Sequence, residues 1–335
     1  MSPQSSNPSE GHSFEVPANA SRAPCPALNA LANHGYISRD GRNLSFFELL
    51  GALSYVYNLS YPLALLVTVA GFITCGKIQF GDASIPTGAQ SELSEKLSKP
   101  SALSSSIDIL HSLPAYIPRV TLDLASLSKR GFFKIAHNAS LVHPRDVESI
   151  SPHPGLVALF IATACRNKQN SASLVSIARF HAARLKSQPI DSAHEKAARG
   201  ECALAFLVLR GRHPEEDPSY ISPSRAKMSS RARGSPEMEE TKVNRKLALD
   251  RFELHGIIPA ERMEQWFGEE RLPDGWWPDS EEGSPGVRPI KTISLIQAAS
   301  AAYVVGQVVD QVVLTSTRKS KPMDTPVSKH SMSWL

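Results

Sequence analysis

Apolar residues recur at helical spacing along most of this chain, and alternation typical of strands is never sustained. Within residues 24–76, 153–165, 172–185 and 193–209, apolar positions return every three or four residues, which predicts helices. Helical spacing also resumes at 107–127. The pattern therefore predicts a mainly α fold built as one helical domain.

Two apolar stretches raise the question of a membrane. Residues 61–75 are too few for a spanning helix, which needs about 20 residues, so we expect a buried core helix there. Residues 292–315 are long enough, but polar side chains such as Gln307 and Asp310 form a narrow stripe beside a broad apolar face. That helix suits packing on the domain or contact with a membrane interface, and its internal aspartate argues against a spanning role.

Composition divides the chain into three parts. Residues 1–21 are rich in Ser, Pro and Asn, and we expect them to be disordered. The helical domain occupies 22–280, interrupted by polar loops at 81–106 and 214–236. Residues 281–335 form a C-terminal extension made of a linker, the apolar helix and a basic tail.

Charge and cysteine content exclude several classes of function. Lys and Arg number 36 against 32 Asp and Glu, a net charge of +4 that is too small to indicate a nucleic-acid partner. The four cysteines are too far apart for a zinc or redox motif. The first twenty residues lack the basic and apolar regions of a signal peptide, so we expect an intracellular, cytoplasmic protein.

A cysteine stands where a helix is predicted to begin. Pro26 suits the first turn of a helix, Leu28 and Leu31 continue it, and Gly35 is a natural stop. Cys25 would then hold the cap position, where free backbone N–H groups and the helix dipole favour a thiolate and lower the thiol pKa. Such a residue can be a nucleophile, a metal ligand or a small buried side chain.

The residues around this cysteine carry a family resemblance. Pro-Cys-Pro is followed by Ala-Asn-His-Gly-Tyr at 32–36 and Arg-Asp-Gly-Arg-Asn at 39–43. This run closely resembles the N-terminal segment of the fungal chloroperoxidase-like haem-thiolate peroxidases, a family that includes the unspecific peroxygenases. The resemblance implies a helical haem-peroxidase domain in which Cys25 is the axial ligand of the iron of haem b. A thiolate in that position favours cleavage of a peroxide O–O bond.

A single carboxylate opens an otherwise apolar run at 201–209. Glu201 either lies buried, where a carboxylate must be paired, protonated or at a cavity edge, or sits at an exposed helix start and complements the dipole. The Gly-Glu-x-Ala pattern resembles the family segment that carries the catalytic glutamate. The resemblance implies that Glu201 moves a proton from one peroxide oxygen to the other, so that water leaves.

A third segment resembles the family but departs from it. Phe-Lys-Ile-Ala-His-Asn-Ala-Ser-Leu is similar to the family's Glu-His-Asp-x-Ser-Leu, which implies that His137 orients the catalytic glutamate and Ser140 helps to hold magnesium or manganese. Ala136 and Asn138 replace the two carboxylates of that pattern. Hard cations prefer carboxylate oxygens, so either the ion is absent or water and backbone carbonyls complete its shell.

These residues together predict an enzyme. We expect a haem-thiolate peroxidase or peroxygenase that uses hydrogen peroxide to hydroxylate, oxygenate or halogenate a small lipophilic molecule, as a tailoring step in fungal secondary metabolism. A weaker match at 252–277 indicates a structural closing segment. The alternative is a haem-binding or scaffold protein of the same fold that has lost catalysis, which the changes at Ala136 and Asn138 favour.

Overall fold

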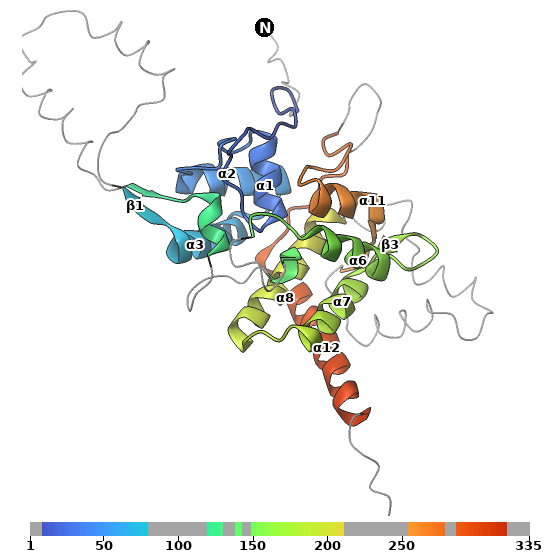
Figure 1. Ribbon diagram of the computed structural model, residues 1–335. Coiled ribbons are helices and arrows are strands. Elements are labelled where there is room, and N and C mark those ends of the chain that lie inside the picture. Colours follow the sequence, from blue (N-terminus) through green and yellow to red (C-terminus); the bar gives the residue numbers. More distant parts are fainter. Residues whose placement is uncertain are drawn as a thin grey trace, which may run out of the picture.

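The computed structural model of the protein describes residues 9–79, 119–129, 138–142, 149–210, 254–278 and 286–319, with side chains up to residue 313. Helices dominate these residues, which confirms the predicted mainly α fold (Figure 1). The α-helices are α1 (Pro26–Asn33), α2 (Phe46–Tyr57), α3 (Tyr61–Cys75), α6 (Pro154–Ala164), α7 (Leu174–Ser187), α8 (Ser192–Leu209), α11 (Ala260–Met263) and α12 (Leu295–Lys319). Shorter helical turns are η2 (Leu124–Ser128), η3 (Asn138–Ser140) and the π-helical η6 (Glu264–Gly268).

Two short antiparallel ribbons join distant parts of the chain. β1 (Lys77–Gln79) pairs with β2 (Arg119–Thr121), and β3 (Ser171–Ala172) pairs with β4 (Ile258–Pro259). The helix predicted over 107–127 is therefore wrong for residues 119–123, where β2 and a short link stand, whereas 124–128 form the 3-10 helix η2. Helical spacing of apolar residues did not reveal that this stretch finds its hydrogen bonds on β1 and on Leu44.

Residues 9–21 lie along α1, which differs from the disorder that their composition predicts. Glu15 N–H donates to the carbonyl of Asn33 at 2.8 Å, and the His12 ring stacks on Tyr36 with 3.8 Å between ring centroids. Ser21 is buried at the end of this stretch. The segment reaches order through contacts with α1 and the turn after it, not through a hydrophobic pattern of its own.

The predicted helix at 61–75 is confirmed as α3, but only one of its faces is buried. Leu63 and Phe72 pack into the core beside α2, whereas Leu66 and Ile73 point outward, and Ile73 is 79% exposed. The prediction of a buried core helix is thus confirmed for one face of α3 and not for the other. A helix that is apolar all round gives no signal for which side meets the protein.

The predicted helices at 153–165, 172–185 and 193–209 are confirmed as α6, α7 and α8. Local signals account for their starts: Ser173 and Ser176 form a capping box on α7, and the Asp191 carboxylate accepts from two N–H groups at the start of α8.

The closing segment packs against α2, with the Trp276 indole donating to the carbonyl of Val56. It is structural, as its sequence indicates.

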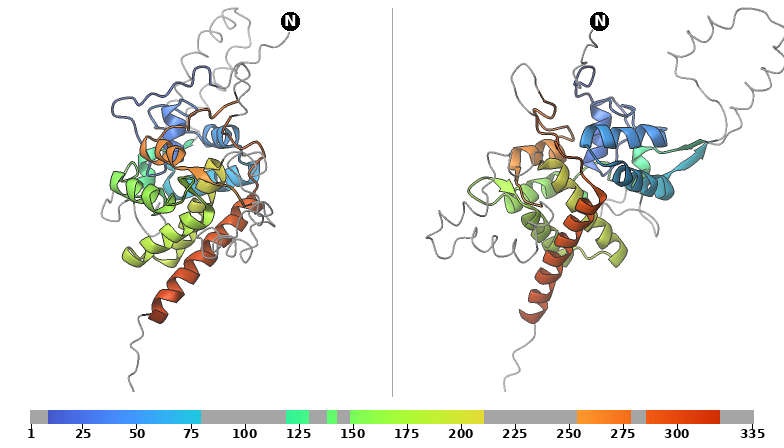
Figure 2. Two further views of the ribbon diagram at one scale, coloured as in Figure 1. Left: turned by 90° about the vertical axis from the view of Figure 1, so that its right-hand side faces the viewer. Right: turned by 180° about the vertical axis from the view of Figure 1, so that it is seen from behind.

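The C-terminal helix α12 lies along α7 and α8, and its far end points away from the rest of the molecule (Figures 1 and 2). Its buried face carries Ala301, Val304 and Val305, and Asp310 accepts from Arg199 of α8 at 2.9 Å. The chain before it pairs with Leu59 through Ile293. Within the described part of the chain, no helix combines the length and apolar character needed to cross a membrane.

Truncating a buried α12 side chain tests this packing. Val305 is 0% exposed, so Val305→Ala is expected to lower the free energy of unfolding by about 2 kcal/mol, through lost burial and the cavity left behind. Tyr303 on the same helix is 67% exposed, and Tyr303→Ala should change it by less than about 0.5 kcal/mol. Equal values from chemical denaturation of the two variants would mean that α12 does not pack on the domain.

Candidate active site

The candidate haem ligand caps α1 as the sequence predicts. Cys25 has extended backbone angles (φ −81°, ψ 110°), and Pro26 occupies the first helical position after it. Pro24 and Pro26 both restrict the backbone, so the direction of the sulfur is fixed by the chain itself. The N–H groups of Ala27 and Leu28 are directed at the sulfur, which lies at the N-terminal end of the helix.

The acidity of this thiol differs from the expectation. The pKa of Cys25 is raised to about 11, mainly by burial, with smaller contributions from the charges of Glu201 and Glu270. The backbone N–H groups of Leu28 and Ala27 lower the pKa but do not outweigh burial. The predicted lowering is therefore wrong, because a sequence shows the helix start but neither the burial nor the acidic neighbours.

The candidate acid–base residue lies in the middle of a helix. α8 begins at Ser192, nine residues before Glu201, so the alternative of an exposed helix start is wrong. Glu201 is half-buried, and its Oε2 accepts a hydrogen bond from the backbone N–H of Ala139 at 3.1 Å. Its charge also acts on Cys25, so the structure brings both candidates into one electrostatic neighbourhood.

The third sequence segment reaches the same place. Residues 138–142 form η3 and the turn after it, where Leu141 takes a left-handed conformation (φ 60°). Two further hydrogen bonds hold this segment: His153 N–H donates to the carbonyl of Leu141 at 2.9 Å, and Arg184 donates to that of Val142 at 3.0 Å. Together with the bond from Ala139 to Glu201, they fix η3 against α7 and α8.

The predicted supporting residues divide between described and undescribed parts of the chain. His137 and Ala136 lie outside the described residues, directly before η3. Ser140 is buried in η3. Among the residues that the structure describes, no group of three or more His, Cys, Asp or Glu is placed to hold a metal ion. The magnesium or manganese site thus stays a prediction that rests on Ser140 and on undescribed neighbours.

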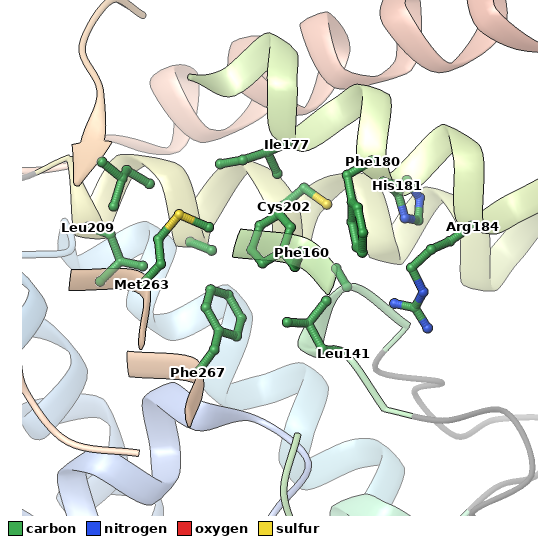
Figure 3. Close-up of a pocket in the computed structure, with 13 residues that line it drawn as sticks. Leu141, Phe160, Ile177, Phe180, His181, Arg184, Cys202, Leu209, Met263 and Phe267 are labelled. Carbon is green, nitrogen blue, oxygen red and sulfur yellow. The ribbon is translucent and has the colours of Figure 1, made fainter. Parts of the chain in front are cut away.

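A small cavity lies between η3, α6, α7, α8 and the segment of α11 and η6 (Figure 3). Its volume is about 20 Å³, and its wall is mostly apolar, with His181 and Arg184 at one end. Cys202 is buried and lines it as well. Because Cys25 is not part of the wall and the volume is far below that of a porphyrin, this cavity is not a haem site.

Comparison with known proteins identifies the family. The model of the family "Peroxidase, family 2" matches residues 12–281, which is most of the chain. This chain belongs to peroxidase family 2. The match includes α1, η3, α8 and the closing segment, so the family assignment covers Cys25 and Glu201 together.

Individual relatives of this family 2 chain match over shorter stretches. The chain is 47% identical over 55 residues to the aromatic peroxidase fscJ of Fusarium equiseti and 44% identical over 62 residues to the chloroperoxidase of Leptoxyphium fumago. It is 43% identical over 61 residues to the dothistromin biosynthesis peroxidase dotB of Dothistroma septosporum. These segments are 16%, 18% and 18% of this chain and span only 12%, 17% and 14% of the respective relatives.

The sequence did not indicate Glu270 as a candidate site residue of this family 2 chain. Glu270 lies in the closing segment, where its Oε1 accepts from Asn29 Nδ2 at 2.6 Å, and its charge acts on Cys25. Burial raises the pKa of Glu270 to about 7, against the smaller opposing effects of Asn29 and Arg22. No sequence signal separates it from Glu269, which is exposed and paired with Arg271.

This shift predicts a dependence of stability on pH. The unfolded carboxyl ionises near 4.5, whereas folded Glu270 keeps its proton to about 7. Between those values the folded state binds more protons, so stability falls as pH rises from about 4.5 to 7 and levels off above. Glu270→Gln should remove this contribution and stabilise the protein at pH 8 by about 2 kcal/mol. Thermal unfolding of both proteins at pH 5 and pH 8 measures it, and parallel curves would contradict the shift.

Proposed function

We propose that this chain is a haem-thiolate peroxidase that uses hydrogen peroxide to oxidise a small lipophilic molecule, with haem b as its cofactor. The observation that carries the proposal is the joint placement of Cys25 at the start of α1 and Glu201 in α8, in a chain of peroxidase family 2. When bound, haem would supply an iron centre at which a peroxide O–O bond is cleaved, and the Cys25 thiolate would hold that iron and favour the cleavage.

The residues around Cys25 fit the binding of haem iron by its sulfur. A thiol must lose its proton to bind a metal, and the buried, acidic surroundings of Cys25 oppose a free thiolate. The same surroundings favour a bound cation, because Glu201 and Glu270 both act on the sulfur through negative charge. The N–H groups of Ala27 and Leu28 face the sulfur and favour the thiolate once it forms.

Glu201 has the properties of a proton carrier for peroxide. Its carboxylate is half-buried and held from one side by Ala139, so one oxygen is fixed while the group stays close to solvent. From there it can accept a proton from one peroxide oxygen and return it to the other, so that water leaves. In this proposal His137 precedes η3 and positions Glu201.

The substrate class is inferred from relatives and from the sequence. The names of two relatives, an aromatic peroxidase and a dothistromin biosynthesis peroxidase, point to aromatic molecules and to a biosynthetic tailoring step. We propose a lipophilic aromatic substrate for this chain, which is hydroxylated, oxygenated or halogenated.

The test is purification of the full-length protein with supplied haem. We expect a stoichiometric haem chromophore and oxidation of a peroxidase dye and an aromatic probe that depends on peroxide. A haem-loaded protein without turnover would instead support the non-catalytic haem-binding alternative, which the Ala136 and Asn138 changes favour. A colourless protein would defeat both proposals.

A further inference from the structure

His181 of α7 is a buried histidine whose ring has no hydrogen-bond partner within the described part of the chain. Its side chain is 2% exposed, and neither ring nitrogen has a hydrogen-bond partner among the residues that the structure describes. Buried polar atoms are almost always hydrogen-bonded, since an unsatisfied one loses its water without compensation. Two unsatisfied ring nitrogens on one buried histidine therefore indicate a bound small molecule that forms hydrogen bonds with the imidazole.

The imidazole of His181 lies at the edge of the cavity described above (Figure 3). The cavity volume is about 20 Å³, and a buried water needs about 10–15 Å³. The space thus suits one molecule of about the size of water and excludes an organic substrate. Opposite the imidazole the wall is apolar, with Phe160 and Phe267 among its residues, so hydrogen bonds to an occupant must come from the end of His181 and Arg184.

The charge state of His181 restricts the chemistry of the occupant. Burial and the nearby Arg184 cation lower the pKa of His181 to about 4, so the ring is neutral near pH 7. A neutral imidazole has one nitrogen that donates and one that accepts. Arg184 disfavours a cation in the same space. A molecule that can both donate and accept hydrogen bonds matches this end of the cavity.

We propose that this cavity binds one small hydroxylic molecule, water or hydrogen peroxide, with His181 as its anchor. The wall of the site includes two neighbours of the candidate acid–base residue: Ala139, whose N–H donates to Glu201, and Cys202, which follows Glu201 in α8. Water and peroxide share the required chemistry and differ by one oxygen. The proposal requires neither bound haem nor turnover, so it can fail or succeed independently of the peroxidase proposal.

Crystals of the full-length protein test the site directly in three states. In untreated crystals we expect a single-atom peak within hydrogen-bonding distance of an imidazole nitrogen of His181. A peroxide soak distinguishes the two occupants, because two-atom density indicates peroxide and an unchanged peak indicates water. Xenon pressure should leave the cavity free of xenon, since a dry apolar cavity binds that gas and a hydrated one does not. A dry or xenon-filled cavity would overturn the proposal.

A pair of substitutions gives a readout in solution that needs no crystal. Ala205→Val adds volume to the cavity wall and displaces the molecule, leaving His181 unsatisfied, so Tm should fall by about 2–4 °C. His181→Leu removes the need for the molecule. In that background Ala205→Val should leave Tm unchanged or raise it, because it fills an apolar space. The same Tm shift for Ala205→Val in both backgrounds would contradict an anchoring role of His181.

Discussion

Replacing Cys25 with alanine is expected to abolish the thiolate-type haem spectrum and all peroxide-dependent turnover. The axial sulfur would be the only bond from this segment to iron, and alanine offers no ligand atom in its place. Helix α1 should survive the change, because Pro26 still sets the first turn. The measurement is the carbon-monoxide difference spectrum of reduced, haem-supplied protein, recorded beside wild type and followed by a dye-oxidation assay.

Cys75→Ala is the matched control for that experiment. Cys75 is a buried cysteine outside any disulfide, but it ends α3 and does not belong to the candidate site. Its loss should leave spectrum and turnover unchanged. If Cys25→Ala kept the thiolate-type band, another sulfur would be the ligand, and the interpretation of the N-terminal segment would be wrong. Circular dichroism of both variants separates loss of the ligand from loss of the fold.

The start of α1 could be predicted because its determinants are local. Pro26 at the first helical position and Gly35 with φ 70° at the end lie within ten residues of each other, and each acts on its own backbone. The environment of Cys25 could not be predicted in the same way. Glu270 is far away in sequence, yet its charge and the burial of the site reverse the expected direction of the thiol pKa.

Elements that pair or pack with segments far away in the sequence were equally hard to predict. β2 is a strand because β1 offers it a hydrogen-bonded edge, and nothing within 119–121 outweighed the helical spacing around it. The pattern of α12 left two placements open, packing on the domain or contact with a membrane interface. The contacts with α7 and α8 show where its buried face lies, which periodicity alone could not assign.

The sequence indicated some of the residues at the candidate site and not others. Glu201 was found because a carboxylate in an apolar run is unusual and a family pattern surrounds it. His181 and Arg184 also lie in a helix with apolar neighbours, one turn apart, but such a pair usually faces solvent. Only the packing of α7 against α8 and η3 shows that both are buried and line one cavity. Burial, and not residue type, makes them candidates for function.

Glu201→Gln is expected to lower the rate of peroxide-dependent oxidation by about 10²–10⁴-fold while leaving the haem spectrum intact. Glutamine keeps an oxygen that can accept the hydrogen bond from Ala139, so η3 should stay in place. It cannot take up or release a proton near neutral pH, so only the proton transfer is lost. The measurement is the initial rate against peroxide concentration, with the haem content of each preparation determined.

A carboxylate on the same helix provides the control. Glu195 pairs with Arg199 two turns before Glu201, and Glu195→Gln should change the rate less than about twofold. If Glu201→Gln were as active as wild type, the carboxylate would not move the proton, and the segment before η3, with His137, would become the leading candidate. If both variants lost activity equally, α8 as a whole would be sensitive to charge. An effect confined to Glu201 therefore separates proton transfer from the general electrostatics of the helix.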